Sequence, residues 1–158
     1  MRLTLTSGAF NHGGKIPDRY SRSGGDISPP LEWDGVSDAC KCLVLIVDDP
    51  DAPSSTFVHW LLYRIPLSLH ELKEGLPHTP ELPNGMRQGL NGFGDIGYGG
   101  PEPPSGTHRY FFKLYLLDTD IDLHPGATRE ELERAIKGHI LEQAELMGRF
   151  ENRNSRAA

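Results

Sequence analysis

The sequence predicts a single domain built mainly from β-strands, arranged as two packed antiparallel sheets with short helices near the C-terminus. The chain contains thirteen prolines and eighteen glycines, most of them in its first two-thirds. The elements between them must therefore be short, which favours strands over helices. A length of 158 residues fits one domain, residues 1–158, that buries a core of its own.

Four runs have strand character. Residues 2–6 alternate two leucines with polar neighbours, as a half-buried strand does. Residues 41–48 (KCLVLIVD) are continuously apolar at their centre, which is typical of a strand buried on both faces. Residues 56–65 and 109–118 are aromatic-rich runs of the kind that favours strands. We expect these four segments to form the sheets.

Long irregular segments separate the predicted strands. Residues 11–30, 66–85 and 92–106 are rich in Gly, Pro, Ser or Asn. Loops of this length in a compact domain usually carry function. We therefore look for a binding site where these loops meet the ends of the strands.

The C-terminal third has helical character. Thr128 and Glu131 have the spacing of a capping box at a helix N-terminus. Apolar residues then recur at helical spacing at Leu132, Ile136, Ile140 and Met147. The pattern predicts one long helix or two short ones, and Gly138 favours two pieces joined near that position.

The charge and hydropathy of the chain narrow its function. A formal net charge of −6 argues against a general nucleic-acid or anionic-membrane binder, because such proteins need a basic surface. The longest apolar stretch, residues 42–47, is far shorter than the ~20 residues of a membrane-spanning helix. The first fifteen residues have no hydrophobic signal-peptide core. We expect a cytoplasmic protein without a membrane span.

Cys40 and Cys42 are the only cysteines. In a strand, their spacing of two places both side chains on one face, and it is not the spacing of a CxxC redox or zinc motif. We expect two buried thiols, which require no oxidising compartment.

A few polar residues stand at ends of the predicted strands. Asp49 and Asp51 lie on a proline-stiffened turn, DPDAP, where acidic residues often only hydrogen-bond their own backbone. His59 lies in an apolar run, where a lone histidine is usually a core group. His108 and Tyr110 share one face of a strand that follows a Gly/Pro-rich loop. Together, these residue types at loop-bordered strand ends favour a binding site.

Four segments that include these residues resemble a known family. They match, in order and approximate spacing, the signature segments of the phosphatidylethanolamine-binding (Raf-kinase-inhibitor-like) family, in particular its bacterial YbhB/YbcL-type branch. The resemblance extends from Ser7 to Phe150. The segments are ISPPLEW (27–33), DDPDAP (48–53), VHW (58–60) and GGPEPPSGTHRY (99–110).

The resemblance implies a Greek-key β-sandwich that binds phosphate-type anions or phospholipid head groups without a cofactor, a resident metal or a catalytic residue. It also implies a cis peptide bond between Ala52 and Pro53, assembly as a homodimer, and regulation of a protein partner such as a kinase or protease. The likeness to longer animal members ends near Phe150, so their kinase-regulatory role is not carried over. The expected ligand-binding residues are Asp49, Asp51, His59, Gly100, His108 and Tyr110.

The chemistry of these residues is compatible with the anion that the resemblance implies. Carboxylates that accept imidazole N–H bonds would orient the rings and raise the histidine pKa, and the Tyr hydroxyl and the backbone of Gly99 and Gly100 would supply further donors. Two charge-assisted hydrogen bonds give roughly 3–6 kcal/mol before binding costs, so we expect a dissociation constant of ~1 mM. Binding should weaken as the pH rises through the histidine pKa.

Two observations qualify this expectation. Members of the family often have cysteine in the GPxPP loop, where this chain has Glu102, so a negative charge near the mouth would repel doubly charged ligands. Two Asp and two His also compose a mixed oxygen and nitrogen metal site, which makes a metal-dependent hydrolase the alternative function. No HExxH motif supports that alternative, and no GxSxG motif supports a serine hydrolase.

Overall fold

The computed structural model describes residues 2–152, and this part of the chain contains eight strands, one α-helix and two short 3₁₀ turns. The strands are β1 (Thr4–Thr6), β2 (Leu31–Asp34), β3 (Cys42–Asp49), β4 (Phe57–Ile65), β5 (Glu71–Leu72), β6 (Arg87–Gln88), β7 (Thr107–Leu117) and β8 (Ile140–Glu151). The helix is α1 (Arg129–Ile136), and the 3₁₀ turns are η1 (Asp18–Tyr20) and η2 (Pro83–Gly85).

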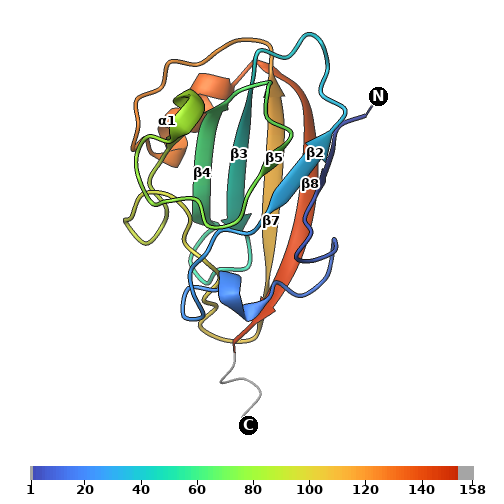
Figure 1. Cartoon of the computed structure of the whole chain (residues 1–158). Coiled ribbons are helices and arrows are strands. Elements are labelled where there is room, and N and C mark those ends of the chain that lie inside the picture. The colour runs from blue at the N-terminus through green and yellow to red at the C-terminus, as the bar shows by residue number, and fades with distance from the viewer. Residues whose placement is uncertain (1, 153–158) are drawn as a thin grey trace.

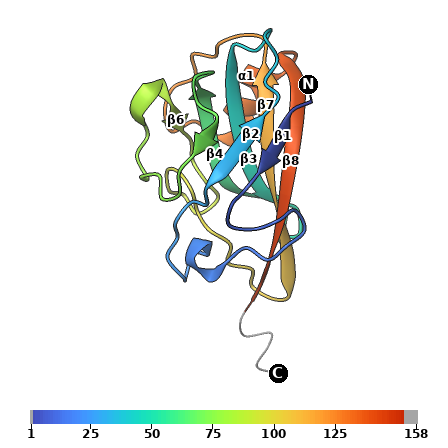
Figure 2. The same ribbon diagram turned by 45° about the vertical axis from the view of Figure 1, so that its right-hand side comes forward.

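The strands form two antiparallel sheets. The small sheet has the order β1-β2-β5, and the large sheet has the order β6-β4-β3-β7-β8 (Figure 1). Figure 2 shows β1 and β2 crossing in front of the large sheet. The chain passes from the small sheet to the large one after β2, returns at β5 and leaves again at β6. The predicted fold class, a mainly β protein of two antiparallel sheets, is confirmed.

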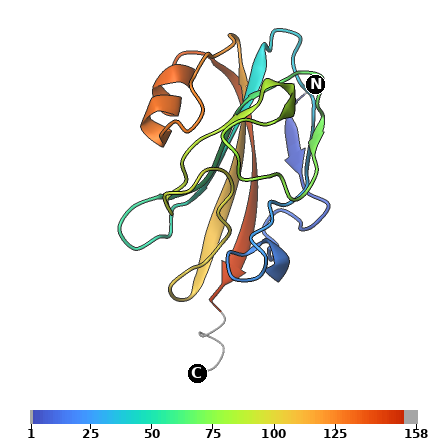
Figure 3. The same cartoon turned by 60° about the vertical axis from the view of Figure 1, so that its left-hand side comes forward.

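Both faces of the large sheet are covered. One hydrophobic cluster fills the space between the two sheets, and a second lies between α1 and the opposite face of the large sheet. Figure 3 shows α1 and the small sheet on opposite sides of the large sheet. This three-layer arrangement explains why all eight residues of β3, the central strand, are buried, as its continuous apolar run predicted.

The four predicted strands are confirmed to within two residues at each end, but the C-terminal prediction is only partly right. Thr128 and Glu131 form the predicted capping box at the start of α1. The helix then ends at Ile136, and Gly138 adopts a left-handed backbone with φ of 81°, a conformation that glycine adopts without steric cost. The expected continuation as a second helix is wrong, because residues 140–151 form β8.

Pairing with β7 decides the conformation of β8. The two strands match along eleven register pairs, from Thr107 opposite Glu151 to Leu117 opposite Ile140. Near its end, β8 buries alternate residues, Leu146, Gly148 and Phe150, which is the period of a strand. The helical spacing of Ile140 and Met147 is therefore coincidental, and tertiary pairing overrides it.

The two cysteines lie on opposite sides of the large sheet. Cys40 precedes β3 and belongs to the cluster between the sheets, whereas Cys42 belongs to the cluster under α1. The expectation of a shared face is wrong because β3 begins only at Cys42. Both thiols are free and buried, as predicted.

No helix in residues 2–152 is long and apolar enough to cross a membrane.

Candidate anion-binding site

The antiparallel order of the large sheet brings three strand ends together. β3 pairs with β4 on one side and with β7 on the other, so the end of β3 lies beside the beginnings of both neighbours. Asp49 is opposite Phe57, and Asp48 is opposite Phe111. Residues that are up to sixty positions apart in the sequence therefore meet at one edge of the sandwich.

A β-bulge turns His59 toward this edge. The pairing register shifts between Val47, which is opposite Trp60, and Asp48, which is opposite Val58. His59 is thus one extra residue on β4, and the alternation of faces is broken at this point. Trp60 packs between the sheets while Val58 packs on the helix side. The bulge places the His59 ring 5.0 Å from the Tyr110 ring, measured between centroids.

A pocket of about 190 Å³ opens at this edge. Four of the six expected ligand-binding residues line it, namely Asp49, His59, His108 and Tyr110. The remaining lining residues are mostly apolar: Ala52, Pro53, Phe57, Phe93, Glu102, Pro103 and Pro104. This volume is below the roughly 300–1,000 Å³ of sites for drug-sized molecules, so the pocket suits a small group.

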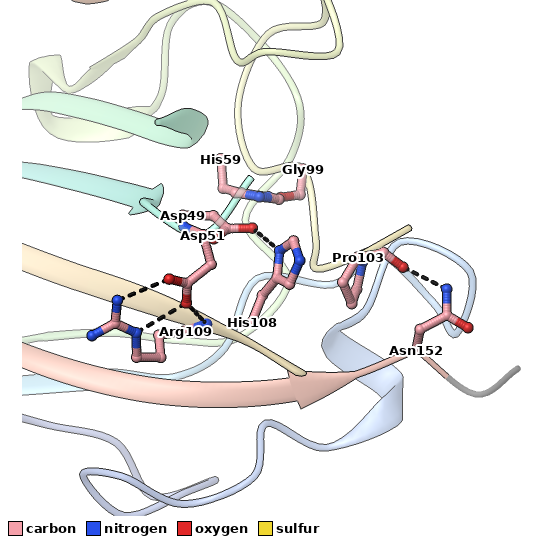
Figure 4. Close-up of polar contacts among 8 residues, drawn as sticks. All are labelled: Asp49, Asp51, His59, Gly99, Pro103, His108, Arg109 and Asn152. Atoms are coloured by element: carbon pink, nitrogen blue, oxygen red, sulfur yellow. Dashed lines mark hydrogen bonds and ion pairs between the residues drawn. The ribbon is translucent and has the colours of Figure 1, made fainter. Parts of the chain in front are cut away.

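His108 is oriented by Asp49. The imidazole Nδ1 donates to Asp49 Oδ2 over 2.6 Å, and both side chains are buried (Figure 4). The other oxygen of this carboxylate, Oδ1, accepts the backbone N–H of Asp51 at 2.8 Å. Asp49 therefore orients the His108 ring through its Nδ1 side, which leaves Nε2 available to a ligand.

His59 differs from the expectation for a histidine beside carboxylates. Burial lowers its pKa, and this effect outweighs the opposing influence of the Gly99 carbonyl and of Asp49. Nδ1 lies 2.7 Å from the Gly99 carbonyl oxygen, to which it donates. The ring is therefore neutral at pH 7, with Nε2 as an acceptor. The prediction of a raised histidine pKa is wrong for His59, because desolvation penalises its charged form more than Asp49 favours it.

Tyr110, which lines the pocket, has an unsatisfied hydroxyl. The residue is buried, and its Oη has no hydrogen-bond partner within residues 2–152. Burial, reinforced by the charges of Asp49 and Asp51, raises the pKa of this phenol well above its usual value. The hydroxyl therefore remains protonated and is a donor without an acceptor, which costs about 1–3 kcal/mol.

Asp51 and Gly100 lie outside the pocket lining. Asp51 accepts the backbone N–H and the guanidinium of Arg109, with three distances of 2.8–2.9 Å (Figure 4). The hydrogen bond from Arg109 lowers the pKa of Asp51 to about 2. Gly100 donates its N–H to Asp26 Oδ1, and Gly99 donates to the His59 carbonyl. Neither N–H is directed at a ligand, unlike in the arrangement we expected.

Two further expectations are affected by this geometry. Every peptide bond in residues 2–152 is trans, so the implied cis bond between Ala52 and Pro53 is not present. Within the same residues, no group of three or more His, Cys, Asp or Glu side chains is placed to hold a metal ion. The pairing of Asp51 with Arg109 removes one carboxylate from the constellation that the hydrolase alternative requires.

Sequence reasoning missed several residues that shape the pocket. Phe57 and Phe93 pack edge to face with centroids 4.8 Å apart and form an aromatic wall. Asn152 Nδ2 donates to the Pro103 carbonyl over 2.6 Å, and this hydrogen bond connects the lining residue Pro103 to the residue that follows β8 (Figure 4). Pro103 belongs to the recognised GPEPPSG loop, but Phe93 and Asn152 carry no signal in the sequence that marks them as site residues.

Comparison with known proteins agrees with this fold. The family model described as "Phosphatidylethanolamine-binding protein" matches residues 6–151. A UPF0098 protein of Methanothermobacter thermautotrophicus is 51% identical over 148 residues, which cover 94% of this chain and 98% of that protein. A UPF0098 protein of Aquifex aeolicus is 47% identical over 151 residues, which cover 94% of this chain and 88% of that protein.

Two solved structures have the same fold. The crystal structure of a putative phosphatidylethanolamine-binding protein homologue from Chlamydia trachomatis aligns with a TM-score of 0.88 and 42% identity, over 96% of this chain and 98% of the other. The structure of Escherichia coli YbcL, described as a member of the mammalian family, aligns with a TM-score of 0.89 and 30% identity, over 96% of this chain and 99% of YbcL. The chain belongs to the phosphatidylethanolamine-binding protein family.

Proposed function

We propose that this protein binds a small phosphate-type anion, free or as the head group of a phospholipid, in the pocket at the end of β3. The observation that carries the proposal is the buried hydroxyl of Tyr110, a residue that lines the pocket; this hydroxyl lacks an acceptor within residues 2–152. An anionic oxygen would satisfy it and recover the cost of the unpaired donor. His108, which Asp49 holds by Nδ1, would donate from Nε2 to the same ligand when its ring is protonated.

The neutral state of His59 refines the expected ligand. Its Nε2 is an acceptor at pH 7, so it would favour a ligand that carries a proton, such as monohydrogen phosphate, over one that carries none. The pocket is small and mostly apolar apart from these polar groups. With two donors directed at one anion, we expect a dissociation constant of ~1 mM.

The test is an NMR titration of the purified protein with inorganic phosphate and with sulfate. We expect chemical-shift changes at Asp49, His59, His108 and Tyr110. The substitution His108→Ala should weaken phosphate binding about tenfold, because it removes a donor worth about 1.5 kcal/mol. His78→Ala is the matched control, since His78 is exposed and does not line the pocket. Equal effects of the two substitutions would contradict the proposal.

We propose a binding protein and not an enzyme. The support is chemical: Asp49 and His108 are engaged with each other, and Asp51 is engaged with Arg109. A cytoplasmic location is also a proposal, and so is a homodimeric state, which rests on the family resemblance. Fractionation of host cells and light scattering of the purified chain would test them.

A further inference from the structure

Residues 20–22 of the first long loop are hydrogen-bonded to residues 98–101, which immediately precede the lining residue Glu102. Tyr98 Oη donates to the Tyr20 carbonyl over 2.6 Å, and the N–H of Arg22 donates to the Pro101 carbonyl over 3.1 Å. A methyl group on Gly100 would lie 2.7 Å from the backbone nitrogen of Arg22, so only glycine permits this approach. These contacts hold the backbone of Arg22 beside Pro101, next to the lining residue Glu102.

The Arg22 side chain contacts two residues that line the pocket. Its guanidinium carbon lies 3.7 Å from the centroid of the Phe93 ring, which is a cation–π contact. Its Nε lies 3.6 Å from Glu102 Oε2, and its second terminal nitrogen lies 3.7 Å from Asp95 Oδ2. Within residues 2–152, Arg22 is the cation that is paired with Glu102.

The charge of Glu102 is the reason that this contact matters. The Glu102 side chain is half exposed at the mouth, and the chain has a formal net charge of −6, so an anion approaching the pocket meets repulsion. The positive charge of Arg22 offsets both Glu102 and Asp95 at the place where the anion enters. Because the pairs are long and partly exposed, they add little to folding stability.

We propose that Arg22 is a specificity-determining residue of the pocket, which sets the charge at its mouth and so permits entry of a doubly charged anion. This inference rests on the proposed anion binding. A single charge at a solvent-exposed mouth changes the affinity by about threefold per unit of ligand charge at low salt. The effect should therefore be about tenfold for a dianion and about threefold for a monoanion.

The experiment compares sulfate, a dianion, with methanesulfonate, a monoanion, in NMR titrations at constant low ionic strength. Arg22→Gln should weaken sulfate binding about tenfold and methanesulfonate binding about threefold. Glu102→Gln should strengthen both in the same proportion, and the double variant should return close to the wild type. Arg22→Lys should retain most of the affinity because it keeps the charge.

Arg19→Gln is the matched control. Arg19 lies on the same segment and pairs with Glu74 over 2.6 Å, away from the pocket lining, so its loss should leave both affinities unchanged. Equal weakening of sulfate and methanesulfonate by Arg22→Gln would overturn the inference, because it would assign Arg22 to the packing of Phe93 alone. Unchanged affinities would also overturn it. If the wild type binds neither anion, the proposed function fails together with this inference.

Discussion

His108 donates from Nδ1 to Asp49 Oδ2 over 2.6 Å, with both side chains buried. The neighbouring pair of Asp51 and Arg109 has comparable distances but lies at the surface, where the arginine side chain is 49% exposed. Two aspartates separated by one residue thus have different physical roles. One orients a pocket residue out of contact with water, and the other makes an ion pair that solvent screens.

We predict that Asp49→Ala destabilises the protein by about 2–3 kcal/mol, because it leaves the buried His108 donor without its charged acceptor. Asp51→Ala, the matched control, should cost less than about 1 kcal/mol, because exposed ion pairs contribute little. Urea unfolding at pH 7 measures both. Equal losses would show that the burial of the Asp49 pair has no energetic consequence.

Tyr110→Phe should separate binding from stability. The substitution removes a hydroxyl that has no partner within residues 2–152, so the free energy of unfolding should stay constant or rise by about 1 kcal/mol. Phosphate binding should weaken about tenfold. The control is Tyr98→Phe, which removes a hydroxyl that donates to the Tyr20 carbonyl and should lower stability by about 1 kcal/mol. A Tyr110→Phe protein with unaltered phosphate affinity would remove the main support for the proposed site.

The buried His59 should make stability depend on pH. Its pKa is lowered in the folded state, whereas in the unfolded chain a histidine titrates near pH ~6.5. As the pH falls below that value, the unfolded chain gains a proton that the folded protein does not bind, and the free energy of unfolding decreases. His59→Gln should reduce this decrease between pH 7 and pH 5, measured by urea unfolding.

The control for His59 is His78→Gln, which changes an exposed ring and should preserve the wild-type pH dependence. The opposite sign, a stability that grows as the pH falls through this range and is lost in His59→Gln, would indicate a raised His59 pKa.

Gly100 should be intolerant of substitution for reasons of space. A methyl group at this position would lie 2.3 Å from the Tyr20 carbonyl oxygen, which belongs to the backbone and cannot move aside alone. We expect Gly100→Ala to cost about 1–3 kcal/mol. At Gly8 a methyl group would have no neighbour within 4 Å, so Gly8→Ala should be nearly neutral. Similar melting temperatures for the two variants would argue against this close approach.

Metal analysis of the purified protein tests the hydrolase alternative. We predict no stoichiometric Zn, Mn or Fe, because in residues 2–152 the carboxylate of Asp49 is hydrogen-bonded to His108 and that of Asp51 is hydrogen-bonded to Arg109. One equivalent of metal per chain that disappears in a His59→Ala, His108→Ala double variant would favour the hydrolase instead.

The sequence alone predicted the fold class and four of the eight strands in residues 2–152, because its strongest signals are local. The continuous apolar run of β3, the aromatic-rich runs of β4 and β7, and the capping box of α1 each describe their own environment. The motif segments likewise identified four residues that line the pocket. Their convergence follows from the antiparallel pairing of β4 and β7 with the two edges of β3.

Only the tertiary structure decided the features that depend on a partner distant in sequence. Residues 140–151 are a strand because β7 offers them an edge to pair with, although their apolar spacing is partly helical. His59 faces the pocket because a bulge adds one residue to β4, and its pKa falls because packing excludes water. Asp51 turns away because Arg109 lies within reach. Register, burial and ion pairing belong to pairs of segments, so no single segment of the sequence encodes them.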